Sequence, residues 1–267
     1  MMVSAASIAF MLLSLLISGL GPILLSVWLY RRLRFSIRAL LVGVMIFLVS
    51  QVFLRIPGLQ ILAQTAWYRG LTQNPWLLGL FLGLTAGIFE EVGRWLGLRY
   101  LVKKQWQTKN GIAYGIGHGG IEAILFSGLT MLNNLIISLM INGGTYDQIA
   151  SQVGPTAAET IRRNLVETPA YLFGVSGLER AATMVVHIAL SLVVLEAVRR
   201  ARPLYLVIAI LLHGLLNAPL AVLMQLPNPY LWSELWVLAG AVVSFLYIRR
   251  MWKADQAVQP PDGVQPA

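Results

Sequence analysis

The strongest constraint on how this chain folds is a series of seven apolar stretches, each near the roughly 20 residues that a helix needs to cross the hydrocarbon core of a bilayer. Only 12% of the 267 residues are charged, whereas soluble domains carry about 25%. Such a chain cannot cover itself with polar surface, so lipid must be its solvent. The stretches span approximately residues 5–30, 36–54, 76–101, 110–141, 179–198, 203–225 and 232–250. We therefore predict an all-α, polytopic transmembrane helical bundle of about seven spans, integral to the membrane.

Basic residues follow every second span. Clusters of Lys and Arg lie after the first, third, fifth and seventh spans, whereas the opposite loops contain few. The clusters occupy residues 31–38, 103–109, 199–202 and 249–253. By the positive-inside rule, the N-terminus is expected outside and the C-terminus in the cytoplasm, in the plasma (inner) membrane of a prokaryote. This bias explains the net charge of +9, so no nucleic-acid partner is expected.

The segments outside the spans suggest a simple domain organisation. Residues 142–178 are expected to form an external loop, in which Pro155–Glu167 has the pattern of a short amphipathic helix on the membrane surface. The tail at 254–267 is rich in Pro, Gln and Gly and is predicted to be a disordered cytoplasmic segment. Residues 1–253 are then a single membrane domain. The absence of cysteine excludes thiolate metal ligands.

Several polar and ionisable side chains lie inside the apolar spans. Each charged group costs at least about 2.5–3.5 kcal/mol to insert there, so its presence needs a reason. The set comprises Glu90, Glu91 and Arg94 in the third span, His118 and Glu122 in the fourth, His187 in the fifth, and His213 and Asn217 in the sixth. Because all three histidines of the protein belong to this set, we expect a functional site within the membrane.

The depth of these residues indicates that they meet. Glu91, His118, His187 and His213 each lie 9–12 residues from the basic cluster at the cytoplasmic end of their own span. At about 1.5 Å of rise per residue, this separation places all four roughly 14–18 Å below the cytoplasmic border. Four helices therefore contribute polar groups to one layer.

Helical spacing predicts which of these side chains share a face. Glu90 and Glu91 fall within one turn of Arg94, so an internal ion pair can offset part of their burial cost. His118 and Glu122 are four residues apart, as are His213 and Asn217. Purely structural roles remain open for two of these residues. His187 can be no more than a helix–helix hydrogen bond, and Glu122 can be a packing contact rather than a ligand or a support for His118.

The motifs around these residues resemble those of a known superfamily. Glu90-Glu91-Val92-Gly93-Arg94, Tyr114-Gly115-Ile116-Gly117-His118 and His213-Gly214-Leu215-Leu216-Asn217 are similar to the three motifs of the CAAX-processing and bacteriocin-processing (CPBP, Abi) intramembrane proteases. The stretch from His118 to Glu122 resembles the YhfC branch, which is described as an intramembrane metalloprotease. The resemblance covers roughly residues 76–225, the expected motif-bearing core.

The resemblance implies an intramembrane endopeptidase that hydrolyses a peptide bond of a membrane-embedded or membrane-associated substrate. By this analogy, a glutamate of the Glu90/Glu91 pair and His118 activate a water molecule, and a buried carboxylate is chemically suited to act as general base. His213 and Asn217 would stabilise the oxyanion of the tetrahedral intermediate. The supporting residues are Arg94, expected to keep one glutamate ionised and aimed, together with Glu122 and His187.

A metal ion is compatible with the same residues. Three histidines and several carboxylates at one depth could hold Zn²⁺ with an open position for water. The candidate ligands are His118, Glu122, His187 and His213. A glutamate-activated water without a metal is the alternative that the sequence leaves open.

Two other functional classes are compatible with buried glutamates and histidines. A proton- or metal-coupled transporter uses such groups as relays, but we find neither paired half-sequences nor matching broken helices of the kind many transporters have. A non-catalytic scaffold related to the proteases is the other alternative. The presence of both the glutamate pair and Asn217 favours the enzyme, because a scaffold needs neither a base nor an oxyanion donor.

Overall fold

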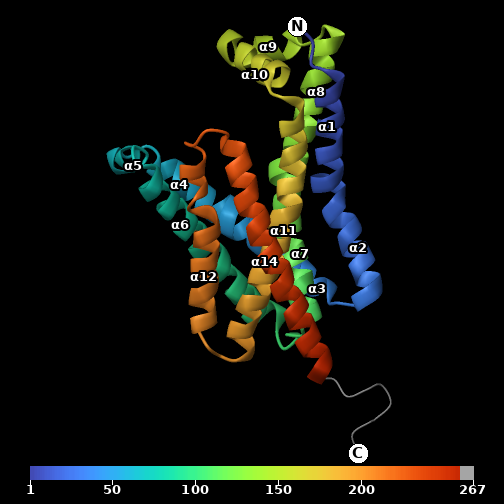
Figure 1. Ribbon diagram of the computed structural model, residues 1–267, viewed down its shortest axis with the longest axis vertical. Coiled ribbons are helices and arrows are strands. Elements are labelled where there is room, and N and C mark those ends of the chain that lie inside the picture. Colours follow the sequence, from blue (N-terminus) through green and yellow to red (C-terminus); the bar gives the residue numbers. More distant parts are fainter. Residues whose placement is uncertain (259–267) are drawn as a thin grey trace, which may run out of the picture. The chain divides into compact units, whose positions relative to one another are not determined.

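The structure is a computed structural model that describes residues 1–258, and over that range it contains helices and connecting loops but no strand (Figure 1). Four π-helical segments, η1 to η4, interrupt the longer helices. The elements are α1 (Ala5–Leu15), η1 (Leu16–Leu20), α2 (Gly21–Leu33), α3 (Ile37–Phe47), η2 (Leu48–Arg55), α4 (Ile56–Leu62), α5 (Ala66–Leu71), α6 (Pro75–Leu96), η3 (Gly97–Val102), α7 (Thr108–Ala123), η4 (Ile124–Gly128), α8 (Leu129–Gly143), α9 (Asp147–Val153), α10 (Pro155–Glu167), α11 (Ala170–Arg199), α12 (Leu204–Asn217), α13 (Leu220–Leu223) and α14 (Pro229–Val258).

Seven of the continuous helical stretches within residues 1–258 are long and apolar enough to cross a membrane. This confirms the predicted fold class and number of spans. The stretches are Ala5–Leu33, Ile37–Leu62, Pro75–Val102, Thr108–Gly143, Ala170–Arg199, Leu204–Leu223 and Pro229–Ala257. The protein is therefore an all-helical integral membrane protein.

Three of the predicted boundaries are corrected by the structure, and the first correction is that the second span continues to Leu62 rather than ending near residue 54. The fifth span begins at Ala170 rather than near residue 179, because Pro169 is compatible with a helix start and residues 170–178 are largely apolar. The predicted external loop is correspondingly shorter. Helix α14 runs to Val258, so the first residues of the predicted tail are helical; the remainder, 259–267, lies outside the described residues.

The described residues cluster into two compact units. One unit contains Met1–Val27 and Gly120–Ala181, and the other contains Trp28–Gly119 together with the chain from Ala182 onward. This division leaves the prediction of one membrane domain at residues 1–253 untested.

The unit that contains α1 is held together by close helix packing and buried serines. Ser14 of α1 donates a hydrogen bond to the Phe173 carbonyl and accepts one from the Gly177 amide, which ties α1 to α11. The predicted surface helix is present as α10, with the same bounds, and buries Ala158 and Leu165. The sequence therefore located this helix correctly.

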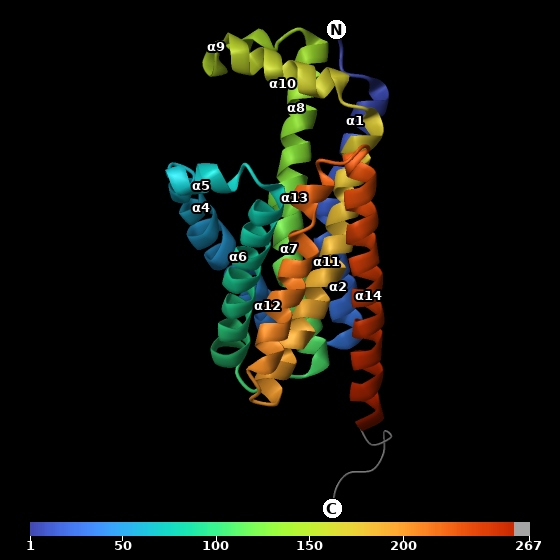
Figure 2. The ribbon, with the colours of Figure 1, turned by 60° about the vertical axis from the view of Figure 1, so that its left-hand side comes forward.

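In the other unit, α6 and α12 pack closely against each other and lie side by side in both views (Figures 1 and 2). Glycines on α6 permit the approach, since a methyl group placed on Gly83 would lie 2.7 Å from the Gly214 carbonyl oxygen. A methyl group on Gly87 would lie 2.6 Å from the Ile210 carbonyl oxygen. Small residues at such spacing allow membrane helices to pack backbone to backbone. This contact places Glu91 beside His213.

Glycines of α7 likewise allow close packing against its two neighbours, α3 and α11. Gly117 faces the backbone of Leu40 on α3, and Gly115 faces the backbone of Ile188 on α11. A methyl group on Gly119 would lie 3.0 Å from His187 Cβ. The absence of side chains at these glycines of α7 therefore brings His118 and His187 within reach of each other.

Candidate metal centre

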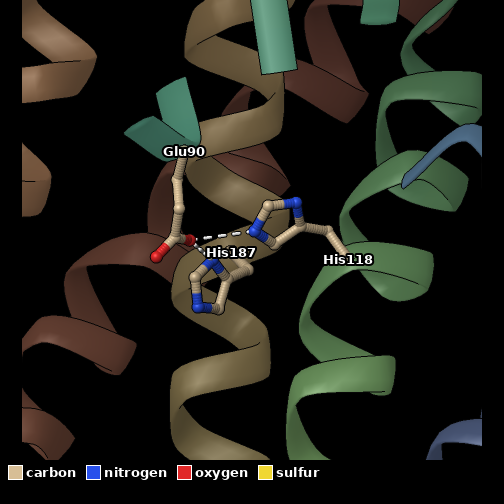
Figure 3. A group of neighbouring side chains, drawn as sticks. All are labelled: Glu90, His118 and His187. Carbon is tan, nitrogen blue, oxygen red and sulfur yellow. Dashed lines mark hydrogen bonds and ion pairs between the residues drawn. The ribbon is translucent and has the colours of Figure 1, made fainter. Parts of the chain in front are cut away.

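Three buried side chains converge from three helices in Figure 3: Glu90 from α6, His118 from α7 and His187 from α11. His118 Nε2 lies 2.9 Å from Glu90 Oε2, and His187 Nδ1 lies 3.9 Å from the same oxygen. One potential ligand atom from each residue lies within 4.8 Å of the others. A carboxylate and two imidazoles at this separation form a candidate metal centre.

The second glutamate of the pair faces a different histidine. Glu91 Oε1 lies 2.8 Å from His213 Nδ1, and Glu91 Oε2 lies 3.4 Å from Arg94 Nε. An ionised carboxylate only accepts hydrogen bonds, so we assign the proton of the neutral imidazole to Nδ1. The other nitrogen, His213 Nε2, lies 3.8 Å from Glu90 Oε1. His213 therefore links the two glutamates.

Arg94 is fully buried and connects Glu91 to α11. Its Nη1 donates to the His187 carbonyl oxygen at 3.0 Å and to Ser191 Oγ at 3.2 Å. Its Nη2 lies 3.2 Å from His187 Nδ1. Because a guanidinium has no acceptor, His187 Nδ1 must be the acceptor here. Arg94 thus fixes the His187 backbone and ring while pairing with Glu91.

Ring packing sets the orientation of His118. The Phe47 ring meets the imidazole edge-on, with centroids 5.2 Å apart, and Tyr114 stacks at 6.5 Å. Within residues 1–258, His118 Nδ1 is buried without a hydrogen-bond partner. The His118 side chain is therefore positioned by Glu90 on one nitrogen and by aromatic contacts around the ring.

The residues of the cluster fit a divalent cation in number, type and charge. One carboxylate with two imidazoles leaves a coordination position open, which is the arrangement of catalytic rather than structural zinc sites. Glu90 and Glu91 together carry two negative charges, and Arg94 supplies one positive charge. The remaining negative charge is buried and is compensated only in part by Arg55 of η2, which reaches Glu90 through Gln51, and an incompletely compensated buried charge is costly. A bound cation would supply that compensation.

The structure brings together six of the eight residues that the sequence analysis selected: Glu90, Glu91, Arg94, His118, His187 and His213. Glu122 instead pairs with Arg180 at 2.9 Å, within the unit that contains α1. Asn217, half-buried at the end of α12, makes no hydrogen bond to the cluster among the described residues. The candidate ligand group among the described residues is Glu90, His118 and His187, and metal binding by Glu122 or His213 stays a prediction.

The sequence analysis missed a residue that contacts the cluster. Gln51, on η2, donates a hydrogen bond from Nε2 to Glu90 Oε1, and its own Oε1 accepts one from Arg55 Nη1 at 3.2 Å. The signal was present, because Gln51 and Arg55 are four residues apart at the end of the second apolar span. A neutral amide costs less to bury than a charge, so a criterion based on the cost of buried charges does not select Gln51.

Two comparisons with known proteins give matches over most of the chain. Residues 16–241 match the family described as "YhfC intramembrane metalloprotease". The chain is 38% identical over 226 residues to "Uncharacterized membrane protein YhfC" of Bacillus subtilis (strain 168), a match that covers 84% of this chain and 87% of the relative. No solved structure matches. The matched region includes every residue of the cluster, and the chain belongs to the YhfC family.

Proposed function

We propose that this protein is an intramembrane metalloendopeptidase that hydrolyses a peptide bond of a membrane-embedded or membrane-associated substrate. The observation that supports this most directly is the buried group of Glu90, His118 and His187, which offers metal ligands to one point (Figure 3). The family description and the motif resemblance to CPBP proteases support the same reaction class. Zn²⁺ is the ion that we propose, because two imidazoles and one carboxylate suit it.

In this proposal, Glu90, His118 and His187 would hold the ion, and His187 Nδ1 would give to the ion the lone pair with which it otherwise accepts from Arg94 Nη2. When bound, it would polarise the scissile carbonyl and make a water molecule more acidic. The three ligands come from different helices, so the packed helices keep the ligands in place. Water-poor surroundings strengthen the electrostatic interactions of the site.

Glu91 and His213 form the proton-handling pair of the proposed reaction. With Nδ1–H donating to Glu91, His213 Nε2 is free to accept a proton from the attacking water. The Glu91 carboxylate then stabilises the imidazolium, as an aspartate does behind the histidine of a serine-protease triad. The imidazolium returns the proton to the leaving amine, which completes hydrolysis. This role for His213 adds to the oxyanion role implied by the resemblance.

Asn217 and Arg94 support these steps. Asn217 follows His213 by one turn of α12, so its amide can donate to an oxyanion formed beside His213. Arg94 keeps Glu91 ionised by the ion pair at 3.4 Å and fixes His187 through its backbone carbonyl. We also propose that the protein lies in a prokaryotic inner membrane with its N-terminus outside, as the basic clusters predict.

The experiment that tests the proposed function compares the N-termini of membrane proteins, by mass spectrometry, in cells that express the wild type or Glu90→Ala/Glu91→Ala at equal levels. New N-termini that require the wild type are expected, and they would identify the substrate and the cleavage position. A matched control is Glu196→Gln, a buried glutamate that pairs with Arg199 and Arg200 outside the cluster. Identical termini in all three strains would favour a transporter or a scaffold instead.

A further inference from the structure

A hydrogen-bonded chain of buried and half-buried side chains, Arg55 and Gln51, ends on Glu90. Gln51 is 6% exposed and lies on η2, a π-helical segment. A buried amide must satisfy both of its ends, and here one end bonds Glu90 while the other bonds Arg55.

Arg55 determines which way the amide points. A guanidinium can only donate, so the Gln51 side-chain oxygen must face Arg55. The amide NH₂ is then left for Glu90 Oε1, and the direction of this hydrogen bond follows from chemistry rather than from an arbitrary choice of amide orientation. Glu90 Oε1 is therefore an acceptor.

Arg55 is itself fixed to the helix that carries Glu90. Its Nη2 donates to the Leu82 carbonyl oxygen at 2.8 Å, and its Nε donates to Thr85 Oγ1 at 3.3 Å. Both partners lie on α6, within the two and a half turns before Glu90. The chain from α6 through Arg55 and Gln51 thus returns to α6 and forms a closed brace.

The brace occupies only one oxygen of the carboxylate. Glu90 Oε2 is the atom that lies 2.9 Å from His118 Nε2 and 3.9 Å from His187 Nδ1. Gln51 holds Oε1, so the carboxylate cannot turn freely and Oε2 stays directed toward the two imidazoles. Partners of this kind orient a ligand and raise metal affinity.

We propose that Gln51, oriented by Arg55, is a positioning residue that holds the Glu90 carboxylate in its metal-binding orientation. This inference rests on the proposed function, because it requires Glu90 to bind a metal. It adds the second span of the chain, Ile37–Leu62, to the site. This span lies outside the three motifs that carry the resemblance. Gln51 does not itself touch the ion or the substrate.

The test is the affinity of the purified full-length protein for Zn²⁺, measured by calorimetry in detergent after chelation and desalting. Gln51→Met keeps the length and shape of the side chain without its hydrogen bonds. We expect its Zn²⁺ affinity to fall about 10–100-fold with unchanged stoichiometry. The matched control is Ser50→Ala, a buried neighbour on η2 whose Oγ bonds the Ile46 carbonyl at 2.7 Å; its affinity should equal that of the wild type.

The role of Arg55 gives a second measurement. Arg55→Met should weaken Zn²⁺ binding less than Gln51→Met, and the double variant should bind about as weakly as Gln51→Met alone, because both residues act through one chain. Gln51→Asn keeps the amide but shortens the side chain. We expect its Zn²⁺ affinity to fall as well, but less than that of Gln51→Met.

The outcomes separate this inference from the proposed function. A wild type that binds one Zn²⁺ together with a folded Gln51→Met that binds it equally tightly would overturn the positioning role alone. A wild type without Zn²⁺ affinity would overturn the proposed metal centre and this inference with it. A loss of affinity in Gln51→Met but not in Ser50→Ala would support both.

Discussion

Glu91 of α6 and His213 of α12 lie 2.8 Å apart, from carboxylate oxygen to imidazole nitrogen, although 122 residues separate them in the chain. The contact depends on the glycines that let these two helices approach. It gives the protein a carboxylate–imidazole pair beside the Glu90, His118 and His187 group. Glu90 and Glu91 thus have different imidazole partners, and we expect them to have different roles.

The first prediction separates the functions of the two glutamates. Glu90→Gln should lose most of its Zn²⁺ affinity, because it removes a ligand. Glu91→Gln should retain Zn²⁺ but lower the rate of proteolysis by about 10²–10⁴-fold, the usual contribution of general acid–base catalysis. Metal content by elemental analysis and cleavage rate, measured on the same preparations, check this. Equal metal loss in both variants would refute the division of roles.

Glu91→Gln also leaves Arg94 without its ion pair. Removing one partner of a buried ion pair typically costs about 3–5 kcal/mol of stability, so the variant is expected to unfold at a lower temperature. Glu91→Gln/Arg94→Met removes both charges and should recover part of that stability without recovering activity. If the double variant were less stable than the single one, the ion pair would not be the source of the cost.

A second prediction concerns the metal stoichiometry. The wild type should bind one Zn²⁺ per chain, and His118→Ala and His187→Ala should each abolish tight binding. Glu122→Gln should bind Zn²⁺ normally, because Glu122 pairs with Arg180 rather than with the ligand group. Dialysis against Zn²⁺ followed by elemental analysis gives the result. Loss of Zn²⁺ in Glu122→Gln would restore Glu122 as a ligand.

A third prediction tests the helix contact that positions His213. Gly83→Ala should destabilise the protein by about 1–3 kcal/mol, the usual cost of overpacking, because its methyl group would lie 2.7 Å from the Gly214 carbonyl oxygen. Gly70→Ala on α5 has nothing within 4 Å of the added methyl group and is the control. Thermal unfolding in detergent compares the two. Equal unfolding temperatures would show that α6 and α12 are not in close contact.

The orientation in the membrane can be tested without removing any native thiol, because the protein contains no cysteine. Asp147→Cys, between the fourth and fifth spans, should react with a membrane-impermeant maleimide in intact cells. Gln105→Cys, between the third and fourth spans, should react only after permeabilisation. Both positions are exposed. The reverse pattern would place the N-terminus in the cytoplasm.

Much of the fold could be predicted from the sequence, because each helix that crosses the bilayer needs a continuous apolar stretch of roughly 20 residues. Hydropathy alone gave the number and order of the spans, now found as seven long apolar helices within residues 1–258. The fifth span starts earlier than predicted, because Glu179 and Arg180 lie inside the helix rather than at its end. In the structure these two residues pair with each other, and Arg180 also pairs with Glu122, which offsets the cost of a longer span.

The composition of the site could be predicted only in part. Counting residues along each span placed the three histidines and the glutamate pair in one layer, and these side chains do meet. Helical spacing could not reveal that Glu122 has an arginine partner from α11. It also could not reveal Gln51, because the contact with Glu90 depends on how η2 packs against α6. Partners across helices are set by tertiary packing.

The most direct test of the central claim uses isolated membranes from cells that express the wild type or Glu90→Gln. The membranes are stripped of metal with a chelator, supplied with Zn²⁺ or with buffer, and followed over time for new protein N-termini by mass spectrometry. We predict cleavage in the wild type only after Zn²⁺ is restored, and none in Glu90→Gln. Cleavage that persists in thoroughly chelated wild-type membranes, or that proceeds equally in Glu90→Gln, would contradict a peptidase that depends on a metal held by Glu90.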